Sequence, residues 1–134
     1  MTKDYKKVSP GFFLGKRDLL AEDLAKFLSP LTEEQLISSR ANCFWSEEDQ
    51  SGFALEDNYL FSVFALKKGK GRALAAAAVA AGAQKLDCLG DHLVSLYSQV
   101  GFKVSFSAPW NQELAPQNWA YARFGKPNYY EMEL

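Results

Sequence analysis

The residues best suited to chemistry in this sequence lie in a short basic stretch, "KKGKGR", at residues 67–72. Two glycines alternate there with four cations: Lys67, Lys68, Gly69, Lys70, Gly71 and Arg72. An alanine-rich run follows, and its composition predicts a helix over residues 72–81. Free N–H groups at a helix N-terminus attract anions, and glycines let the backbone approach a ligand closely. The stretch therefore predicts a phosphate-binding turn, with a merely solvated lysine turn as the alternative.

Two features narrow the kind of anion. The nucleotide-binding motifs G-x-x-x-x-G-K-[ST] and G-x-G-x-x-G are both absent from the sequence. The formal net charge of −1 argues against a nucleic-acid-binding protein, which needs a broad basic surface. Any positive patch must be local, and residues 67–72 are its densest candidate.

The elements around this turn must hold it in place. Residues 59–66 are apolar on both faces, which is typical of a strand buried between two layers. A strand over 52–56 precedes it, joined through Asp57 and Asn58, two residues that tolerate the left-handed backbone of a tight hairpin. After the alanine helix, residues 84–89 predict another buried strand. The turn thus lies between a buried strand and a helix.

The rest of the chain completes a mixed α/β pattern. A polar loop is expected over 45–52, and Gly82 is placed to end the alanine helix. Further helices are predicted over 17–30, from Thr32 with a Thr32–Gln35 capping box, and over 90–101 with Asp91 as the cap. Further strands are predicted over 11–17, 102–108 and 119–124. This order predicts one domain over 1–134, a mixed sheet with helices on both faces.

The cysteines and the apolar segments indicate the cellular compartment in which the protein is expected. Cys43 and Cys88 stand 45 residues apart with no signal peptide, which indicates reduced thiols in a cytoplasmic protein. Cys88 falls on a buried strand, where a cysteine is more often part of the core than a nucleophile. No apolar stretch approaches the ~18 residues that a membrane span needs, so no membrane association is expected. No cluster of histidine, cysteine and carboxylates has metal-ligand spacing, so no metal is expected.

Two motifs resemble those of the GNAT family of acyl-CoA N-acyltransferases. One is L-Y-x-x-x-G-F, matched here by Leu96, Tyr97, Gly101 and Phe102. The other is the family's Q/R-x-x-G-x-G/A turn, which grips the coenzyme A diphosphate. The segment "LKKGKGRAL" is similar to that turn, with Gly69 and Gly71 in its glycine positions. The resemblance spans residues 52–107, and the tail is similar to that of small phage-encoded GNAT-like proteins.

The match has three departures. The Q/R position of the turn is Leu66, so the charge there must come from neighbouring cations. An asparagine that the family often has seven residues before the tyrosine is Gly90, and its usual alanine four residues before is Leu93. These changes affect pantetheine binding and catalysis more than the fold.

The resemblance implies a GNAT-like fold, a mixed and mostly antiparallel twisted sheet with helices on both faces, and acetyl-CoA as co-substrate. The turn and the helix start would bind the diphosphate through Lys67, Lys68, Gly69, Lys70, Gly71, Arg72 and Ala73. The preceding strand would offer backbone groups to pantetheine at Ser62, Val63, Phe64 and Ala65. Its family counterpart splays from the next strand and leaves a cleft for the thioester.

The resemblance also implies the catalytic groups. Tyr97 would protonate the leaving thiolate, since a phenol with a pKa near 10 is suited to that step; the alternative is a core aromatic. A base must deprotonate the amine, and Glu56, at the end of its strand, is the first candidate. Glu47 and Glu48 in the preceding loop follow, and the alternative for each of these carboxylates is a solvated side chain. His92, the only histidine, lies near the start of the Tyr97 helix and is a further candidate base.

Three functions remain open at this stage. The first is an N-acetyltransferase that moves acetyl from acetyl-CoA to an amine on a small molecule or a protein. The second is a non-catalytic GNAT-like module that binds coenzyme A or a protein partner, which the missing Q/R and the missing asparagine favour. The third, a nucleic-acid-binding domain, conflicts with the acidic charge balance. The sequence leaves the acceptor and the oligomeric state open, a homodimer included.

Overall fold

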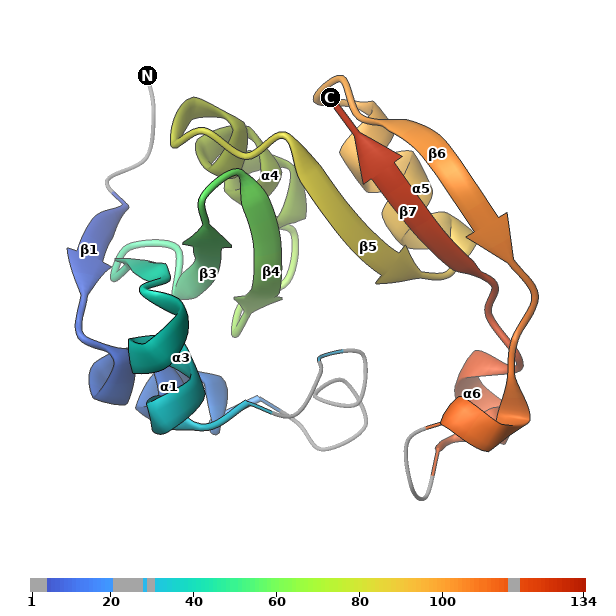
Figure 1. Ribbon diagram of the computed structural model, residues 1–134, viewed down its shortest axis with the longest axis horizontal. Helices are drawn as coiled ribbons and strands as arrows, with labels where there is room; N and C mark the ends of the chain where they lie inside the picture. Colours follow the sequence, from blue (N-terminus) through green and yellow to red (C-terminus); the bar gives the residue numbers. More distant parts are fainter. Residues whose placement is uncertain (1–4, 21–27, 29–30, 116–118) are drawn as a thin grey trace.

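A computed structural model describes residues 5–20, 28, 31–115 and 119–134, and within them the chain forms a sheet of seven strands (Figure 1). The strands follow the order β1-β2-β3-β4-β5-β7-β6. Their bounds are β1 Lys6–Val8, β2 Asn42–Ser46, β3 Ser51–Glu56, β4 Tyr59–Ala65, β5 Lys85–Leu89, β6 Lys103–Ala108 and β7 Tyr129–Glu133. All neighbours are antiparallel except β4 and β5, which are parallel. The expected mixed, mostly antiparallel sheet is confirmed.

Helices cover both faces of this sheet. They are α1 Pro10–Arg17, α3 Glu33–Ser39, α4 Gly71–Ala80, α5 Asp91–Ser98, α6 Tyr121–Phe124 and a 3-10 turn, η1 Gln112–Leu114. In Figure 1, α4 lies behind β3 and β4, α5 lies behind β5 and β7, and α1 and α3 lie together near β2. Successive side chains of β3 point to opposite faces of the sheet. Phe53 therefore joins the core under α4, while Ala54 joins the core under α1 and α3.

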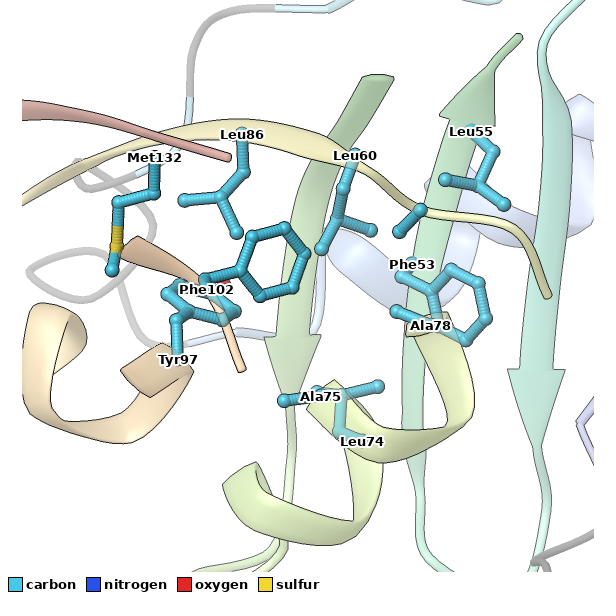
Figure 2. Packing of buried hydrophobic residues seen from close by; sticks show 11 residues of the cluster. Phe53, Leu55, Leu60, Leu74, Ala75, Ala78, Leu86, Tyr97, Phe102 and Met132 are labelled. Atoms are coloured by element: carbon cyan, nitrogen blue, oxygen red, sulfur yellow. The ribbon is translucent and has the colours of Figure 1, made fainter. Parts of the chain in front are cut away.

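The alanine helix packs closely on the sheet. Leu74, Ala75 and Ala78 of α4 are buried, whereas Ala76 is exposed. Figure 2 shows the buried alanines beside Phe53 and the other apolar side chains of that core. A side chain without bulk lets the helix axis approach the strands, which accounts for the close packing of α4. This packing determines where the turn before α4 lies.

Several local predictions are confirmed. The hairpin of β3 and β4 turns at Asp57, which has a φ of 54°. Thr32 and Gln35 form the capping box of α3, with both reciprocal hydrogen bonds present. Gly82 follows the end of α4 at a φ of 113°, a backbone conformation that favours glycine. In each case the chemistry is local, so short-range patterns were sufficient.

Four local predictions are wrong. Residues 11–17 are helical because Ser9 caps the helix and Pro10 occupies its first turn. Of the polar loop predicted over 45–52, only 47–50 form a turn, because 45–46 end β2 and 51–52 begin β3. The last strand lies at 129–133, while 121–124 form α6. Asp91 begins α5, but Gly90 occupies the cap position. The helix predicted over 17–30 falls largely outside the described residues. Arg17, where that helix was predicted to begin, is the last residue of α1.

Strands β4 and β5 separate soon after they begin. Only Tyr59 pairs with Lys85 and Leu60 with Leu86. Opposite β3, β4 carries a bulge where the register shifts, and Ser62 there has a φ of 50°. A bulge bends and twists its strand. The bend accompanies the divergence of β4 from β5 that Figure 1 shows.

None of the helices in the described part of the chain is long and apolar enough to cross a membrane.

Candidate active site

A cavity of about 330 Å³ lies where β4 and β5 diverge. Its walls come from β4, β5, the start of α4 and the first turns of α5, with Phe124 of α6 at one side. Most lining side chains are apolar, and the polar or ionisable ones in the described lining are Ser62, Asp87, Cys88, His92 and Tyr97. The volume lies at the lower end of the ~300–1,000 Å³ range of small-molecule sites.

The basic turn leads directly into one end of this cavity. Lys70 is the cap residue of α4, and no side chain caps the first amides of the helix. Gly71, the first helical residue, lines the cavity. Gly69 has a φ of 78°, and no atom lies within 4 Å of the position that a Cβ would take. An uncapped helix start with open space before it is a site for an anion.

The four cations of the turn fall into two pairs. Lys67 donates from Nζ to the Glu48 carbonyl oxygen at 3.2 Å. Lys70 Nζ lies 3.5 Å from Oδ1 of Asp49, whose side chain is 1% exposed. Both therefore tie the turn to the β2–β3 connection. Within the described residues, Lys68 and Arg72 are exposed and form no ion pair, so their charge is available to a ligand.

The diverging strands leave main-chain groups without a ladder partner. β4 pairs with β3 along its length, but on its other edge only its first two residues pair with β5. The edge from Phe61 to Ala65 therefore faces the cavity, and this stretch includes four of the residues that the sequence singled out for pantetheine. Buried amide groups without partners are costly. A ligand with amides of its own would satisfy them.

Tyr97 lies deep in the same cavity. It is 5% exposed and packs edge-on against Phe102, with ring centroids 5.9 Å apart (Figure 2). Burial strongly raises the pKa of Tyr97, and the nearby Cys88 and Asp87 raise it further. The phenol therefore stays protonated near neutral pH. It is suited to donating a hydrogen bond, and both sequence-based roles, core aromatic and donor, fit this position.

The structure does not bring the expected carboxylates to Tyr97. Glu56 ends β3 beside the β3–β4 turn, where β4 and β5 are still paired, and it lies outside the cavity lining. Glu47 accepts a hydrogen bond from Trp45 Nε1 at 2.8 Å. That bond, and one from Gln50, lower the pKa of Glu47 and weaken it as a base.

His92 is the expected base that does line the cavity. It stands in the first turn of α5, after Gly90. A Cβ on Gly90 would lie 2.9 Å from Nδ1 of His92, and the φ of Gly90 is 97°. Glycine at this position therefore leaves room for the imidazole. The family position that is commonly asparagine thus has a local structural reason to be glycine here.

Cys88 also lines the cavity, on the same face of β5 as the buried Leu86. Burial raises the pKa of the Cys88 thiol to about 12, with a further contribution from Asp87. A thiol with so high a pKa is a poor nucleophile near neutral pH. Within the described residues no group of three histidine, cysteine or carboxylate side chains could hold a metal ion.

Sequence reasoning missed Asp87 and the β4 bulge. Asp87 is the only carboxylate in the described lining, and it accepts a hydrogen bond from Tyr129 at 3.2 Å. A lone acidic residue within the apolar strand "KLDCL" was the available signal. Ser62 gives no such signal, because a positive φ at a serine depends on the tertiary fit of the strand.

Three solved structures share this fold over nearly their whole length. One is yncA from Salmonella typhimurium, assigned as an acetyltransferase and solved with acetyl-CoA. It is 13% identical at a TM-score of 0.58, covering 100% of this chain and 94% of that one. A second, assigned as a phosphinothricin N-acetyltransferase, is 12% identical at a TM-score of 0.58, covering 96% and 95%. A GCN5-related N-acetyltransferase from Kribbella flavida is 14% identical at 0.56, covering 98% and 96%.

No family model matches the sequence, and no curated protein does either. The fold is nevertheless that of the GCN5-related N-acetyltransferases, as the two sequence motifs indicated. At 12 to 14% identity the likeness establishes the fold, and function must be argued from the site.

Proposed function

We propose that this protein binds acetyl-CoA between β4 and β5 and transfers the acetyl group to an amine. The observation that carries the proposal is the cavity itself, which runs from the uncapped start of α4, past the unpaired edge of β4, to Tyr97. An anion site, an amide-binding edge and a proton donor thus follow one another in the order in which diphosphate, pantetheine and thioester occur in acetyl-CoA.

The diphosphate would lie against the first amides of α4. Those N–H groups point out of the helix end, where the helix dipole adds partial positive charge. Lys68 and Arg72 would add charge-assisted contacts, because no ion pair holds either of them within the described residues. Lys67 and Lys70 would act mainly by fixing the turn on the β2–β3 connection.

The pantetheine arm would pair with β4 as an extra strand would. Its amides match the main-chain donors and acceptors that Ser62, Val63, Phe64 and Ala65 leave unpaired on the β5 side. The bulge at Ser62 supports this role, since strained backbone clusters at functional sites. Acetyl-CoA supplies an activated acetyl group, bound to sulfur as a thioester.

In the transfer, the amine nitrogen attacks the thioester carbonyl carbon, the C–N bond forms and the C–S bond breaks. The nitrogen loses one proton and the departing sulfur gains one, so the products are an amide and a free thiol. Holding the two reactants together would supply most of the acceleration. The protein's own groups would then have two tasks, to stabilise the sulfur and to accept the proton from nitrogen.

Tyr97 would stabilise the leaving sulfur. Its raised pKa keeps the hydroxyl protonated, so that it donates a hydrogen bond as negative charge develops on sulfur. His92 would accept the amine proton, because it lines the cavity and an imidazole nitrogen can act as a general base. Glu56, outside the lining, would reach the amine only through water or through a movement of the hairpin.

The test begins with acetyl-CoA binding by calorimetry. A double change of Lys68 and Arg72 to Gln should weaken binding about tenfold or more at low salt, since each contact to a charged group contributes roughly 1.5–3 kcal/mol before screening. The matched control is Lys103→Gln, an exposed lysine on β6 outside the cavity. Equal affinity in all three proteins would exclude this site.

Turnover is measured separately, as thiol release from acetyl-CoA over a panel of small amines, peptides and proteins. Release with any acceptor, abolished by heating and reduced in Tyr97→Phe, is expected. Tight binding of acetyl-CoA with no release from any acceptor would instead favour the non-catalytic module, for which the absence of Glu56 from the cavity lining is the supporting observation.

A further inference from the structure

We infer that Asp49 is a positioning residue of the cofactor site, which acts through Lys70 to hold the start of α4 in the conformation that binds the diphosphate. The inference rests on the proposed function and adds to it a residue outside the described lining of the cavity. Its basis is a fully buried carboxylate beside the basic turn, with Oδ1 of Asp49 3.5 Å from Nζ of Lys70.

The connection between β2 and β3, residues 47–50, holds the first end of the basic turn through its main chain. The Gln50 carbonyl oxygen accepts a hydrogen bond from the Leu66 amide at 2.8 Å. The Glu48 carbonyl oxygen accepts one from Lys67 Nζ at 3.2 Å. Because both acceptors are main-chain groups, a changed side chain in the connection would leave these two bonds in place.

The second end of the turn is held through a side chain. Lys70 is the cap residue of α4, and its carbonyl oxygen accepts a hydrogen bond from the Leu74 amide at 2.9 Å, so its orientation sets that of the first helical turn. Gly69, just before it, has a φ of 78° and open space at the Cβ position. Glycine is conformationally permissive, so the bonds at the first end do not by themselves fix Lys70. The contact with Asp49 supplies that anchor.

The anchor itself is firmly placed. The Asp49 amide donates to Ser46 Oγ at 3.1 Å, and Ser46 and Ser51 are both fully buried. Ser51 Oγ is in turn hydrogen-bonded to Tyr5 Oη. Burying a carboxylate costs free energy, and a buried ion pair often stabilises a fold no more than apolar side chains of the same volume. The pair between Asp49 and Lys70, whose side chain is 33% exposed, is therefore better explained by the shape of the turn than by folding stability.

Charge and position predict opposite effects of removing this carboxylate. A negative charge near an anion site repels the anion, so neutralising Asp49 would strengthen diphosphate binding if only charge mattered. If Asp49 instead holds Lys70 and the helix amides in place, the same change would weaken binding. The sign of the change in affinity therefore distinguishes a positioning residue from a nearby charge.

Calorimetry of the full chain with acetyl-CoA measures that sign. Asp49→Asn keeps the shape of the side chain and should raise the Kd about tenfold or more, roughly what one hydrogen bond to a charged group contributes. Asp57→Asn is the matched control, the same change at an exposed residue that follows β3, with a φ of 54° that asparagine tolerates. Its Kd should stay that of the wild type. An unchanged or lowered Kd in Asp49→Asn would overturn the inference, as would an equal loss in Asp57→Asn.

A double variant tests whether Asp49 acts through Lys70. Lys70→Gln removes the same pair from its more exposed end and should raise the Kd by a similar factor. The double variant, Asp49→Asn with Lys70→Gln, should bind as weakly as Asp49→Asn and no more so, because residues that act as one unit are not additive. If Lys70→Gln leaves the buried carboxylate uncompensated and does not fold, the comparison of Asp49→Asn with the double variant still decides. A further loss of affinity in the double variant would overturn the inference.

The proposed function and this inference fail in different ways. If acetyl-CoA binds wild type and Asp49→Asn equally, the inference falls and the proposed function stands. If acetyl-CoA does not bind wild type, the proposed function falls, and amide hydrogen exchange still decides the role of Asp49. Asp49→Asn should then speed exchange at Leu74, in the first turn of α4, more than at the other amides of the helix. Unchanged exchange, or an equal rise along α4, would overturn the inference.

Discussion

The two sides of the cavity differ in the groups that form them, main chain on one side and side chains on the other. The proposed diphosphate and pantetheine side consists of main chain, namely the start of α4 and the free edge of β4. The opposite wall consists of side chains, Cys88 and His92 among them, from β5 and α5. Main-chain recognition needs only a glycine, a bulge and a helix end, so many sequences can provide it. Side-chain recognition depends on single residues, so far fewer sequences can provide a given arrangement.

The largest expected effect lies where the two sides meet. Tyr97→Phe keeps the ring against Phe102 and removes the hydroxyl. If the hydroxyl serves the leaving sulfur, kcat should fall roughly 10²- to 10⁴-fold. The Kd of acetyl-CoA and the KM of the amine should each change less than about threefold, within the scatter expected when no direct contact is lost. Steady-state kinetics and calorimetry measure the three quantities.

The opposite pattern would reassign Tyr97 to the core. In that case the melting temperature would fall while turnover per folded molecule stayed constant. Tyr97 would then have no part in the reaction.

A glycine pair tests whether the cofactor side depends on backbone shape. Gly69 and Gly82 both have positive φ and open space at the Cβ position, at opposite ends of α4. Alanine at either should therefore cost a similar ~1–2 kcal/mol in folding stability. Only Gly69→Ala should also weaken acetyl-CoA binding, about 10- to 100-fold, because a shifted turn misaligns the helix amides. Comparable losses of affinity in both variants would trace the effect to stability alone.

An alanine pair tests whether the cofactor side depends on helix packing. Ala78 is fully buried against the sheet, whereas Ala76 of the same helix is exposed. Ala78→Leu should lower the free energy of unfolding by ~1–3 kcal/mol through overpacking. Ala76→Leu should change it by less than ~0.5 kcal/mol, as surface substitutions usually do. Chemical denaturation measures both, and equal stabilities would contradict the close approach of α4.

The smallest effect concerns the two thiols. Burial raises the pKa of Cys43 to about 11 and that of Cys88 to about 12, so thiolate is scarce at pH 8 and increases tenfold per pH unit below those values. Alkylation by iodoacetamide should follow that rise. Saturating acetyl-CoA should lower the ratio of the Cys88 rate to the Cys43 rate several-fold, because only Cys88 lines the cavity. An unchanged ratio, read by peptide mass spectrometry, would place the ligand elsewhere.

The same thiols set the sign of a stability change with pH. Their pKa values are higher in the folded chain than the ordinary value of 9.0. The unfolded chain therefore loses these protons first. Stability is fully present below pH 9 and is lost as the pH rises from there toward 11 to 12.

The sequence by itself determined the elements whose signals are local, including those on either side of the basic turn. The hairpin at Asp57, the capping box at Thr32, the alanine helix and its end at Gly82 all follow from propensities that act within a few residues. The basic turn follows a buried strand and precedes a helix start, so its position could be predicted as well. Where a local signal was misinterpreted, as at Ser9 and Pro10, the error concerned a short element.

Only the tertiary structure decided which side chains share the cavity. Glu56 and Asp87 are both acids on strands, and nothing local distinguishes them. Glu56 lies where β4 and β5 are still paired, whereas Asp87 lies after they diverge. The divergence accompanies the bulge at Ser62, whose positive φ is a strained backbone conformation held by the surrounding sheet. Contacts between distant segments are set by how layers pack, and no short pattern in the chain records that.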